Sequence, residues 1–337
     1  MTSPVRRPAG ALALVAAVAG ALVAVVLGFL TFGAQATAAP DGVPVAIAPT
    51  GMPSEIAQRI AAHGGGQLAW TVASPADARK LLEDKKVYGV LELGPGPSAT
   101  VVTSGAVNPS GTQVAQQALT GAASALGGAP KQEVLHPVSV AGRTAPLAAS
   151  ALAWIGALVA GLALTQLAKR TGRTVGAGAR LLQVVGAGVL VTAAVAGFFA
   201  LWDAALPLTF GVLGFVFLAA TAFAALQAGL LRLLGLRAMA VLGPLYLVAP
   251  AVAGQVPELL NPAYRTLLWS WTPFRFSTEG LRSLLQGVPG APDVTTGVRV
   301  LGALLAAGLL VALWPGRSAR EEAESHLPDR VVEVGVH

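Results

Sequence analysis

The chain has 337 residues, of which 54% are hydrophobic and only 11% are charged. A water-soluble protein carries about 25% charged residues, so this composition excludes an ordinary soluble protein and predicts one embedded in lipid. The net charge of +6 does not indicate nucleic-acid binding, because the basic residues form no patch and stand mainly at the ends of apolar runs.

Metal and redox chemistry have little support in the composition. Cysteine is absent, which excludes disulfides and thiolate metal sites. The four histidines are far apart in the sequence. No paired carboxylates, histidine cluster or activated nucleophile stands out, so we expect neither an enzyme nor a cofactor bound by this chain.

Six apolar runs approach the roughly 20 residues that a helix needs to cross a bilayer. They are rich in Ala, Gly, Leu and Val, which favours helices that pack through small residues. The predicted fold class is a polytopic α-helical membrane protein with six transmembrane helices and an extracytoplasmic α/β domain between helices 1 and 2. The runs cover residues 10–33, 146–167, 179–201, 207–231, 238–256 and 297–314.

The basic residues predict the orientation of these spans, because Lys and Arg concentrate in cytoplasmic loops. All the clusters fall on one side if both termini are cytoplasmic, which predicts a multi-pass protein of the cell membrane. Residues 317–337 would form a cytoplasmic tail. The clusters are Arg6 and Arg7; Lys169, Arg170, Arg173 and Arg180; Arg232 and Arg237; and Arg317 and Arg320.

The first apolar run, residues 1–33 with its short basic start, has a second interpretation. The sequence "VRRPAGALALVAA" followed by "AQATAAP" is also typical of a signal peptide with a small-residue cleavage site. The run is longer than a usual signal core, which favours a retained anchor.

Residues 34–145 form the one large polar segment and have the pattern of a small α/β domain. Short apolar runs that read as strands alternate with stretches of helical periodicity, each bounded by Gly, Pro or capping residues. We expect strands at 44–49, 67–73, 87–93 and 99–104, and helices at 54–63, 75–86 and 109–126.

A second unusual segment is residues 267–287, "LLWSWTPFRFSTEGLRSLLQG", within the predicted membrane region 146–316. Trp269 and Trp271 suit the headgroup layer, and Pro273 can start a helix. In that helix Arg275, Glu279 and Arg282 would share one face, so their charges could pair. The apolar face would meet lipid or neighbouring helices.

The order of elements resembles that of ABC type-2 transporter permeases, particularly the phage-infection-protein-like branch. The resemblance is carried by "SPADARKLLEDKKVYGVLEL" and "SATVVTSGAVNPSGTQVAQQAL". In these two stretches of the present chain, as in the family, a helix leads to a Gly-Val strand and then to a second strand. A turn that contains Asn108 and a long helix follow. The resemblance implies a dimer, of identical or different chains, that exports its substrate across the lipid bilayer.

The chain has no G-x-x-x-x-G-K-[ST] phosphate-binding loop, so ATP would be bound by a separate ATP-binding cassette subunit. The resemblance implies a coupling loop for this subunit at Lys169, Arg170 and Arg173. A basic loop that only sets topology is the alternative. The resemblance also implies that 267–287 forms an outer gate, with an amphipathic linker as the alternative.

The middles of the six runs contain no ionisable residue, which argues against ion coupling and favours a lipid-like or amphiphilic substrate. A different class of function remains open. The chain would then be an ATPase-independent envelope protein whose external domain binds a partner.

Overall fold

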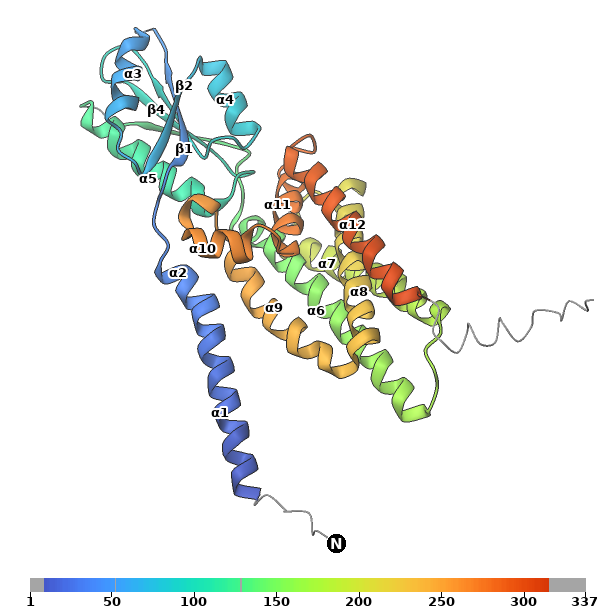
Figure 1. The fold of residues 1–337 in the computed structure, drawn as a ribbon. Helices are drawn as coiled ribbons and strands as arrows, with labels where there is room; N and C mark the ends of the chain where they lie inside the picture. The colour runs from blue at the N-terminus through green and yellow to red at the C-terminus, as the bar shows by residue number, and fades with distance from the viewer. Residues whose placement is uncertain (1–8, 52, 128, 315–337) are drawn as a thin grey trace, which may run out of the picture.

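The structure, a computed structural model, describes residues 9–51, 53–127 and 129–314. The predictions for Arg6, Arg7, Arg317 and Arg320 and for the tail 317–337 lie outside these residues. Figure 1 shows three parts: a single N-terminal helix, a sheet covered by helices, and a bundle of helices.

Five helical stretches of the described chain are long and apolar enough to cross a membrane. This finding confirms the coarse prediction of a helical membrane protein. The stretches are α1 (Ala9–Gly28) continued by η1 (Phe29–Gly33) and α2 (Ala34–Ala36); α6 (Val140–Thr171); α7 (Ala177–Trp202); α8 (Phe210–Leu234) continued by η2 (Gly235–Ala238) and α9 (Met239–Ala253); and α12 (Pro292–Leu313).

The fourth stretch covers two of the six predicted apolar runs. The chain turns at η2, and α9 leaves in a different direction from α8 (Figure 1). Gly235 makes the turn with a φ of 58°, which a residue with a side chain rarely adopts. Helix α9 has 15 residues, or about 22 Å at 1.5 Å per residue, which is less than the roughly 30 Å of a bilayer core.

Helix α8 forms the centre of the bundle, packed against α6, α7 and α12. Small residues allow the α8 and α12 backbones to approach closely. A Cβ atom at Gly308 would lie 2.5 Å from the Ala225 carbonyl carbon. Beside this crossing, Trp154 of α6 packs against Phe223 of α8 with ring centroids 5.2 Å apart.

The sheet has five strands in the order β2-β1-β3-β4-β5. All neighbouring pairs are parallel except β3 and β4, which a Gly-Pro turn joins as an antiparallel pair. The strands are β1 (Val43–Pro49), β2 (Leu68–Val72), β3 (Val90–Leu93), β4 (Ala99–Ser104) and β5 (Lys131–Leu135).

Alternate residues of the strands point to opposite faces, and helices cover both faces. Helices α3 (Ser54–His63) and α5 (Pro109–Ala125) bury one face around Ile47 and Leu91. Helix α4 (Pro75–Glu83) covers the other face. We call strands β1–β5 with α3, α4 and α5 the sheet unit.

The four predicted strands and three predicted helices of this unit are present, with ends shifted by a few residues. Strand β5 was not predicted, because "KQEVL" lacks the apolar character of a buried strand. It is an edge strand, and Glu133 on it pairs with Arg79 of α4 at 2.6 Å. Arg79 also pairs with Glu92 of β3 at 2.6 Å, so one guanidinium joins two strands to α4.

Helix α1 stands apart from the bundle, as Figure 1 shows. Residues 10–26 are all exposed, and contact begins only where Leu27 and Leu30 reach Val248 and Val252 of α9. The Tyr264 hydroxyl donates a hydrogen bond to the Phe29 carbonyl at 2.7 Å.

The chain between α9 and α12 folds into short helices at the end of the bundle nearest the sheet unit. Backbone amides of Ala39 and Asp41, which lead from α2 to β1, donate to carbonyls in this segment. Its elements are η3 (Pro257–Leu259), α10 (Pro262–Tyr264), η4 (Arg265–Trp269) and α11 (Pro273–Leu285).

Candidate functional site

The predicted helix in segment 267–287 is α11, and it lies inside the protein. It begins with Pro273 at its first turn, as the sequence predicts. It packs against α6, α8, α9 and α12. Phe274, Leu281 and Leu285 from its apolar face are buried in the bundle core, so neighbouring helices, rather than lipid, cover that face.

Hydroxyl groups hold α11 against α6. Ser277 and Thr278 donate hydrogen bonds to the Ser150 hydroxyl at 2.8 and 3.2 Å. Ser150 is buried and itself donates to the Pro146 carbonyl within α6 at 3.0 Å. A buried hydroxyl requires a partner, so this cluster fixes how α11 sits on α6.

The charged face of α11 forms only one of the two expected ion pairs. Arg282 Nη1 lies 3.5 Å from Glu279 Oε1. Arg275 instead places its guanidinium 3.7 Å from the centroid of the Trp269 ring and 4.2 Å from that of Phe276. The expected Arg275–Glu279 pair is therefore absent among the described residues, because an aromatic face occupies the guanidinium.

Burial lowers the pKa of the Arg275 guanidinium, and the carboxylates of Glu279 and Asp293 oppose part of that shift. The two predicted tryptophans differ in their surroundings. Trp269 is half-buried and donates to the Gln255 carbonyl at 3.2 Å, whereas Trp271 is 53% exposed.

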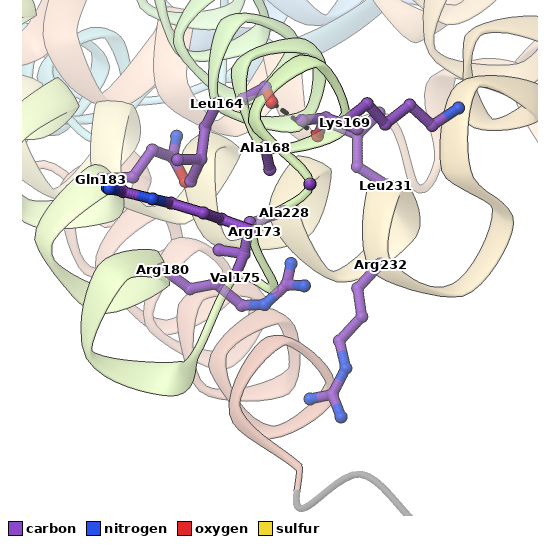
Figure 2. A pocket seen from close by; sticks show the side chains of 13 residues that line it. Leu164, Ala168, Lys169, Arg173, Val175, Arg180, Gln183, Ala228, Leu231 and Arg232 are labelled. Atoms are coloured by element: carbon purple, nitrogen blue, oxygen red, sulfur yellow. Dashed lines mark hydrogen bonds between the residues drawn. The ribbon is translucent and has the colours of Figure 1, made fainter. Parts of the chain in front are cut away.

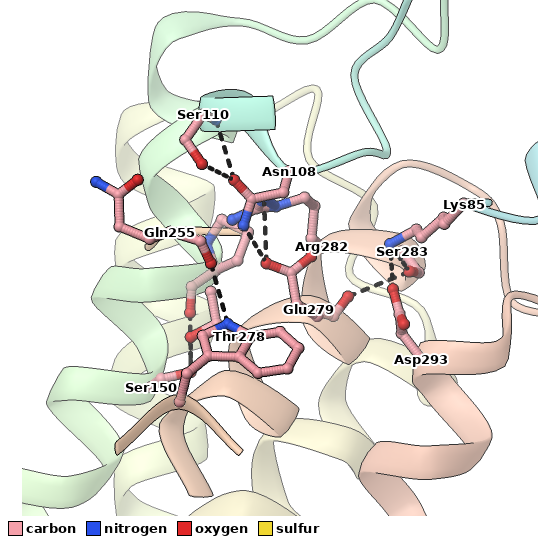
Figure 3. Close-up of polar contacts among 12 residues, drawn as sticks. Lys85, Asn108, Ser110, Ser150, Gln255, Thr278, Glu279, Arg282, Ser283 and Asp293 are labelled. Carbon is pink, nitrogen blue, oxygen red and sulfur yellow. Dashed lines mark hydrogen bonds and ion pairs between the residues drawn. The ribbon is translucent and has the colours of Figure 1, made fainter. Parts of the chain in front are cut away.

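Polar side chains of the sheet unit contact α11 and the first turn of α12 (Figure 3). Lys85, just after α4, lies 2.6 Å from Asp293 and donates to Ser283 at 2.6 Å. Asn108, which caps α5, donates from Nδ2 to Glu279 Oε1 at 2.8 Å. We call this set of contacts between the sheet unit and the bundle the junction.

Tyr88 adds a further contact to the junction. Its hydroxyl donates to Glu258 Oε2 at 2.9 Å. Burial raises the pKa of Tyr88 well above its usual value near 10, and the Glu258 carboxylate raises it further. The phenol therefore stays protonated and keeps its hydrogen bond across the physiological pH range.

The six residues predicted for an outer gate fall around three different cavities. Trp269, Arg275 and Glu279 line a polar cavity of about 180 Å³ together with Lys85 and Asp293. Arg282 lies in the same polar layer but faces another cavity.

Trp271 and Pro273 instead border an apolar cavity of about 700 Å³ between α8, α9 and α12. Leu226, Leu245 and Leu304 also line this cavity, and its described lining has no charged side chain. Segment 267–287 therefore separates a polar space beside the sheet unit from an apolar space among the helices.

Sequence reading missed Lys85, Tyr88, Glu258 and Asp293 as site residues. The residues next to each of them in the sequence form no recognisable motif, and their partners are about 170 to 210 positions away in the chain. Only Asn108 carried a signal, as the expected cap of a helix that opens with Asn-Pro.

The predicted coupling loop lies at the opposite end of the bundle. Helix α6 ends at Thr171, and Lys169 and Arg173 line a cavity of about 300 Å³ there (Figure 2). Arg180 and Arg232 line the same cavity. Arg170, the third predicted residue, is exposed and lies outside the lining.

This basic end, which we define by Lys169, Arg173, Arg180 and Arg232, has no carboxylate in the described lining of its cavity. Arg232 also joins α8 to α12. Its Nη1 donates to the Val311 and Ala312 carbonyls at 3.1 and 2.9 Å, at the C-terminal end of α12. In Figure 2 the Lys169 amine extends away from the guanidinium groups of Arg180 and Arg232.

Within residues 9–51, 53–127 and 129–314, no group of three or more His, Asp or Glu side chains could hold a metal ion. Comparisons with protein-family models, with curated proteins and with solved structures each gave no match to this chain.

Proposed function

We propose that the chain is the membrane-spanning permease subunit of an ABC-type exporter that moves an amphiphilic, lipid-like substrate outward. The observation that carries this proposal is the position of segment 267–287. It lies between the polar junction and an apolar cavity of about 700 Å³, at the end of the bundle opposite the basic loop. An outer gate for an amphiphile requires such a boundary between an apolar space and a polar exit.

The proposed topology has six spans, with both termini in the cytoplasm of a cell-membrane protein and the sheet unit outside. Helix α9 supplies the additional span if the 3-10 turn before it also enters the bilayer, since residues 235–253 together are close to span length. Helices α6 and α12 both begin at the junction and finish at the basic end. The basic end would therefore be cytoplasmic by the preference of Lys and Arg for that side.

The energy source in this proposal is ATP hydrolysis by a separate cassette subunit, with two permease chains, identical or different, forming the transporter. Lys169, Arg170 and Arg173 are the proposed coupling residues. Their charge, together with that of Arg180 and Arg232, suits an acidic surface on the partner, because the described lining offers no carboxylate of its own.

The orientation of the chain in the membrane can be tested by thiol labelling of single introduced cysteines, because the chain contains no cysteine of its own to react. Gln58→Cys on α3 and Thr174→Cys in the α6–α7 loop both replace exposed residues. A membrane-impermeant maleimide applied to whole cells should label the Gln58 variant and leave the Thr174 variant unlabelled until the membrane is opened. The reverse pattern would reject the proposed topology.

The ATPase partner can be tested by a mild-detergent pull-down with mass spectrometry. We expect a nucleotide-binding subunit near stoichiometry, lost when Lys169, Arg170 and Arg173 are all replaced by Gln. Arg59→Gln, an exposed arginine on α3, is the matched control and should retain the subunit. Absence of any such subunit after cross-linking would contradict the ATP-driven proposal.

One observation favours the second candidate, an ATPase-independent envelope protein whose sheet unit binds a partner. A groove of about 450 Å³ runs between α3 and α5, lined by Ile60, Leu68 and Ala122. Trp70 also lines this groove, and its Nε1 donor is buried with no acceptor among the described residues. Under this candidate the pull-down recovers an external protein rather than an ATPase, and Ala122→Arg, which fills the groove, abolishes the capture.

A further inference from the structure

A third cavity lies where the sheet unit meets the start of α6. It has a volume of about 480 Å³ and extends between β4, the first turns of α5 and α6, and the side of α11. Among its described lining residues are two arginines, Arg143 and Arg282, and no carboxylate. The remaining polar lining consists of hydroxyl and amide side chains: Thr103, Ser104, Thr112, Gln113 and Gln116.

Arg282 is buried without enough acceptors for its guanidinium. The residue is 5% exposed, and neither Nε nor Nη1 has a hydrogen-bond acceptor among the described atoms. The Glu279 carboxylate lies 3.5 Å from Nη1, but its Oε1 already accepts from Asn108 at 2.8 Å (Figure 3). A guanidinium presents five N–H donors, so a single distant carboxylate does not satisfy it.

Two residues that line the same cavity carry hydroxyl groups whose O–H has no acceptor among the described atoms. Thr112 Oγ1 is buried with no described partner. Ser104 Oγ accepts from the Ala106 amide at 3.2 Å, which leaves its own O–H as a donor. Arg143 is exposed in the first turn of α6, so the cavity combines one buried and one accessible cation.

These groups define the chemistry of a ligand. A guanidinium binds carboxylates and phosphates with paired hydrogen bonds. Two guanidiniums and two hydroxyls offer more donors than the two oxygens of a carboxylate can accept. The non-bridging oxygens of a phosphate can accept from several groups at once, and the cavity is larger than a phosphate requires.

We propose that this cavity binds the phosphate group of an anionic phosphate ester, held by Arg282 and Arg143. The ester is either the headgroup of an anionic phospholipid or a soluble phosphate ester. The cavity opens beside the first turns of α6, an apolar helix long enough to span a membrane. The site stands whether or not the chain is an ATP-driven permease, because it rests only on the cavity and its donors.

The test uses the full chain, purified in an uncharged detergent. Native mass spectrometry measures binding of phosphatidic acid, with diacylglycerol as the matched lipid that lacks phosphate. The soluble arm measures the thermal unfolding midpoint with glycerol 3-phosphate against sodium chloride of equal ionic strength. If phosphatidic acid binds and glycerol 3-phosphate does not stabilise the protein, the ligand is a lipid headgroup. If glycerol 3-phosphate also stabilises the protein, the site binds the phosphate itself.

Variants assign the binding to the cavity. Arg282→Gln and Arg143→Gln should each weaken binding about 10- to 100-fold, as expected for loss of charge-assisted hydrogen bonds of about 1.5–3 kcal/mol. Arg143 is exposed, so its variant should fold even if Arg282→Gln does not. Arg143→Lys should recover part of the affinity, because it keeps the charge but loses the paired geometry.

Arg59→Gln removes an equal charge from an exposed position outside the cavity and should bind like the wild type. If binding weakened equally in this control, the net charge of the protein rather than the cavity would explain the loss, and the proposal would be overturned. Unchanged affinity in both cavity variants, or no binding of either phosphate ester to the wild type, would also overturn it.

Discussion

The two ends of the helical bundle handle charge differently. At the junction, Lys85 contacts Asp293 and Arg282 lies near Glu279, and both cations are largely buried. At the basic end, four cations line one cavity with no carboxylate in its described lining. A buried cation needs a carboxylate of the protein or a bound ligand nearby, whereas an exposed one can be compensated by water, lipid phosphate or a partner. The junction is thus built to hold two parts together, and the basic end is left available to something else.

From this difference between the two ends, we expect the largest loss of stability when Glu279 is replaced. Glu279→Ala leaves Arg282 buried beside no carboxylate and removes the acceptor of Asn108. We expect the free energy of unfolding to fall by about 3–5 kcal/mol, the usual cost of breaking a buried pair. Reversible unfolding in mixed micelles, followed by tryptophan fluorescence, measures it. Glu83→Ala, at an exposed carboxylate, is the control. Equal losses of unfolding free energy in the two variants would show that Glu279 does not compensate a buried cation.

Lys85 should have the next largest effect. Lys85→Met leaves Asp293 and Ser283 without their partner and should cost about 2–3 kcal/mol of unfolding free energy. The neighbouring Lys86→Met is a close control, since Lys86 is exposed and 3.8 Å from Asp84, and should cost less than about 0.5 kcal/mol. Combining Lys85→Met with Asp293→Asn should cost less than the sum of the single changes. Strict additivity would mean that the two groups do not interact in solution.

Tyr88 should have a smaller and pH-dependent effect. Tyr88→Phe removes the hydrogen bond to Glu258 and should cost about 1 kcal/mol at pH 7. The pKa of Tyr88 is raised in the folded protein, so its stabilisation is complete below the unfolded value near 10 and is lost as the pH rises beyond it. Unfolding midpoints measured from pH 7 to 11 should therefore fall more steeply for wild type than for Tyr88→Phe above pH 10. Parallel curves would contradict the assigned hydrogen bond.

The basic end should show the smallest effects on stability. Arg232→Gln removes the donor to the last carbonyls of α12 and should cost about 0.5–1 kcal/mol. Arg170→Gln, at an exposed position outside the cavity lining, should change stability by less than about 0.5 kcal/mol. A loss at Arg170 as large as that at Glu279 would remove the distinction between the two ends.

The helices and most strands could be predicted from the sequence because their signals are local. Long apolar runs need a lipid or protein interior, and short apolar runs between Gly and Pro residues make strands. Strand β5 escaped because an edge strand needs little apolar character. Gly235 lies between the fourth and fifth apolar runs, but the 15-residue length of α9 could not be read from the length of the fifth run.

The junction could not be predicted, because its contacts join residues far apart in the chain. Spacing suggested that Arg275 would pair with Glu279, four positions along the same helix. The fold instead brings Trp269 over the guanidinium, and Glu279 accepts from Asn108 of the sheet unit. Helical spacing shows which groups can meet, whereas tertiary neighbours decide which of them do.

The close crossing of α8 and α12 at Gly308 and Ala225 has a mechanical consequence. Where the backbones touch at Gly308 no side chain lies between them to absorb sliding, so we expect this pair of helices to move as one unit. The start of α12 is fastened to the sheet unit through Asp293, and its end is fastened to Arg232 of α8. We therefore expect a tilt of the sheet unit to be carried along α8 and α12 to the far end of the bundle. Distances between spin labels at the two ends, measured with and without the Lys85–Asp293 contact, would reveal this transmission.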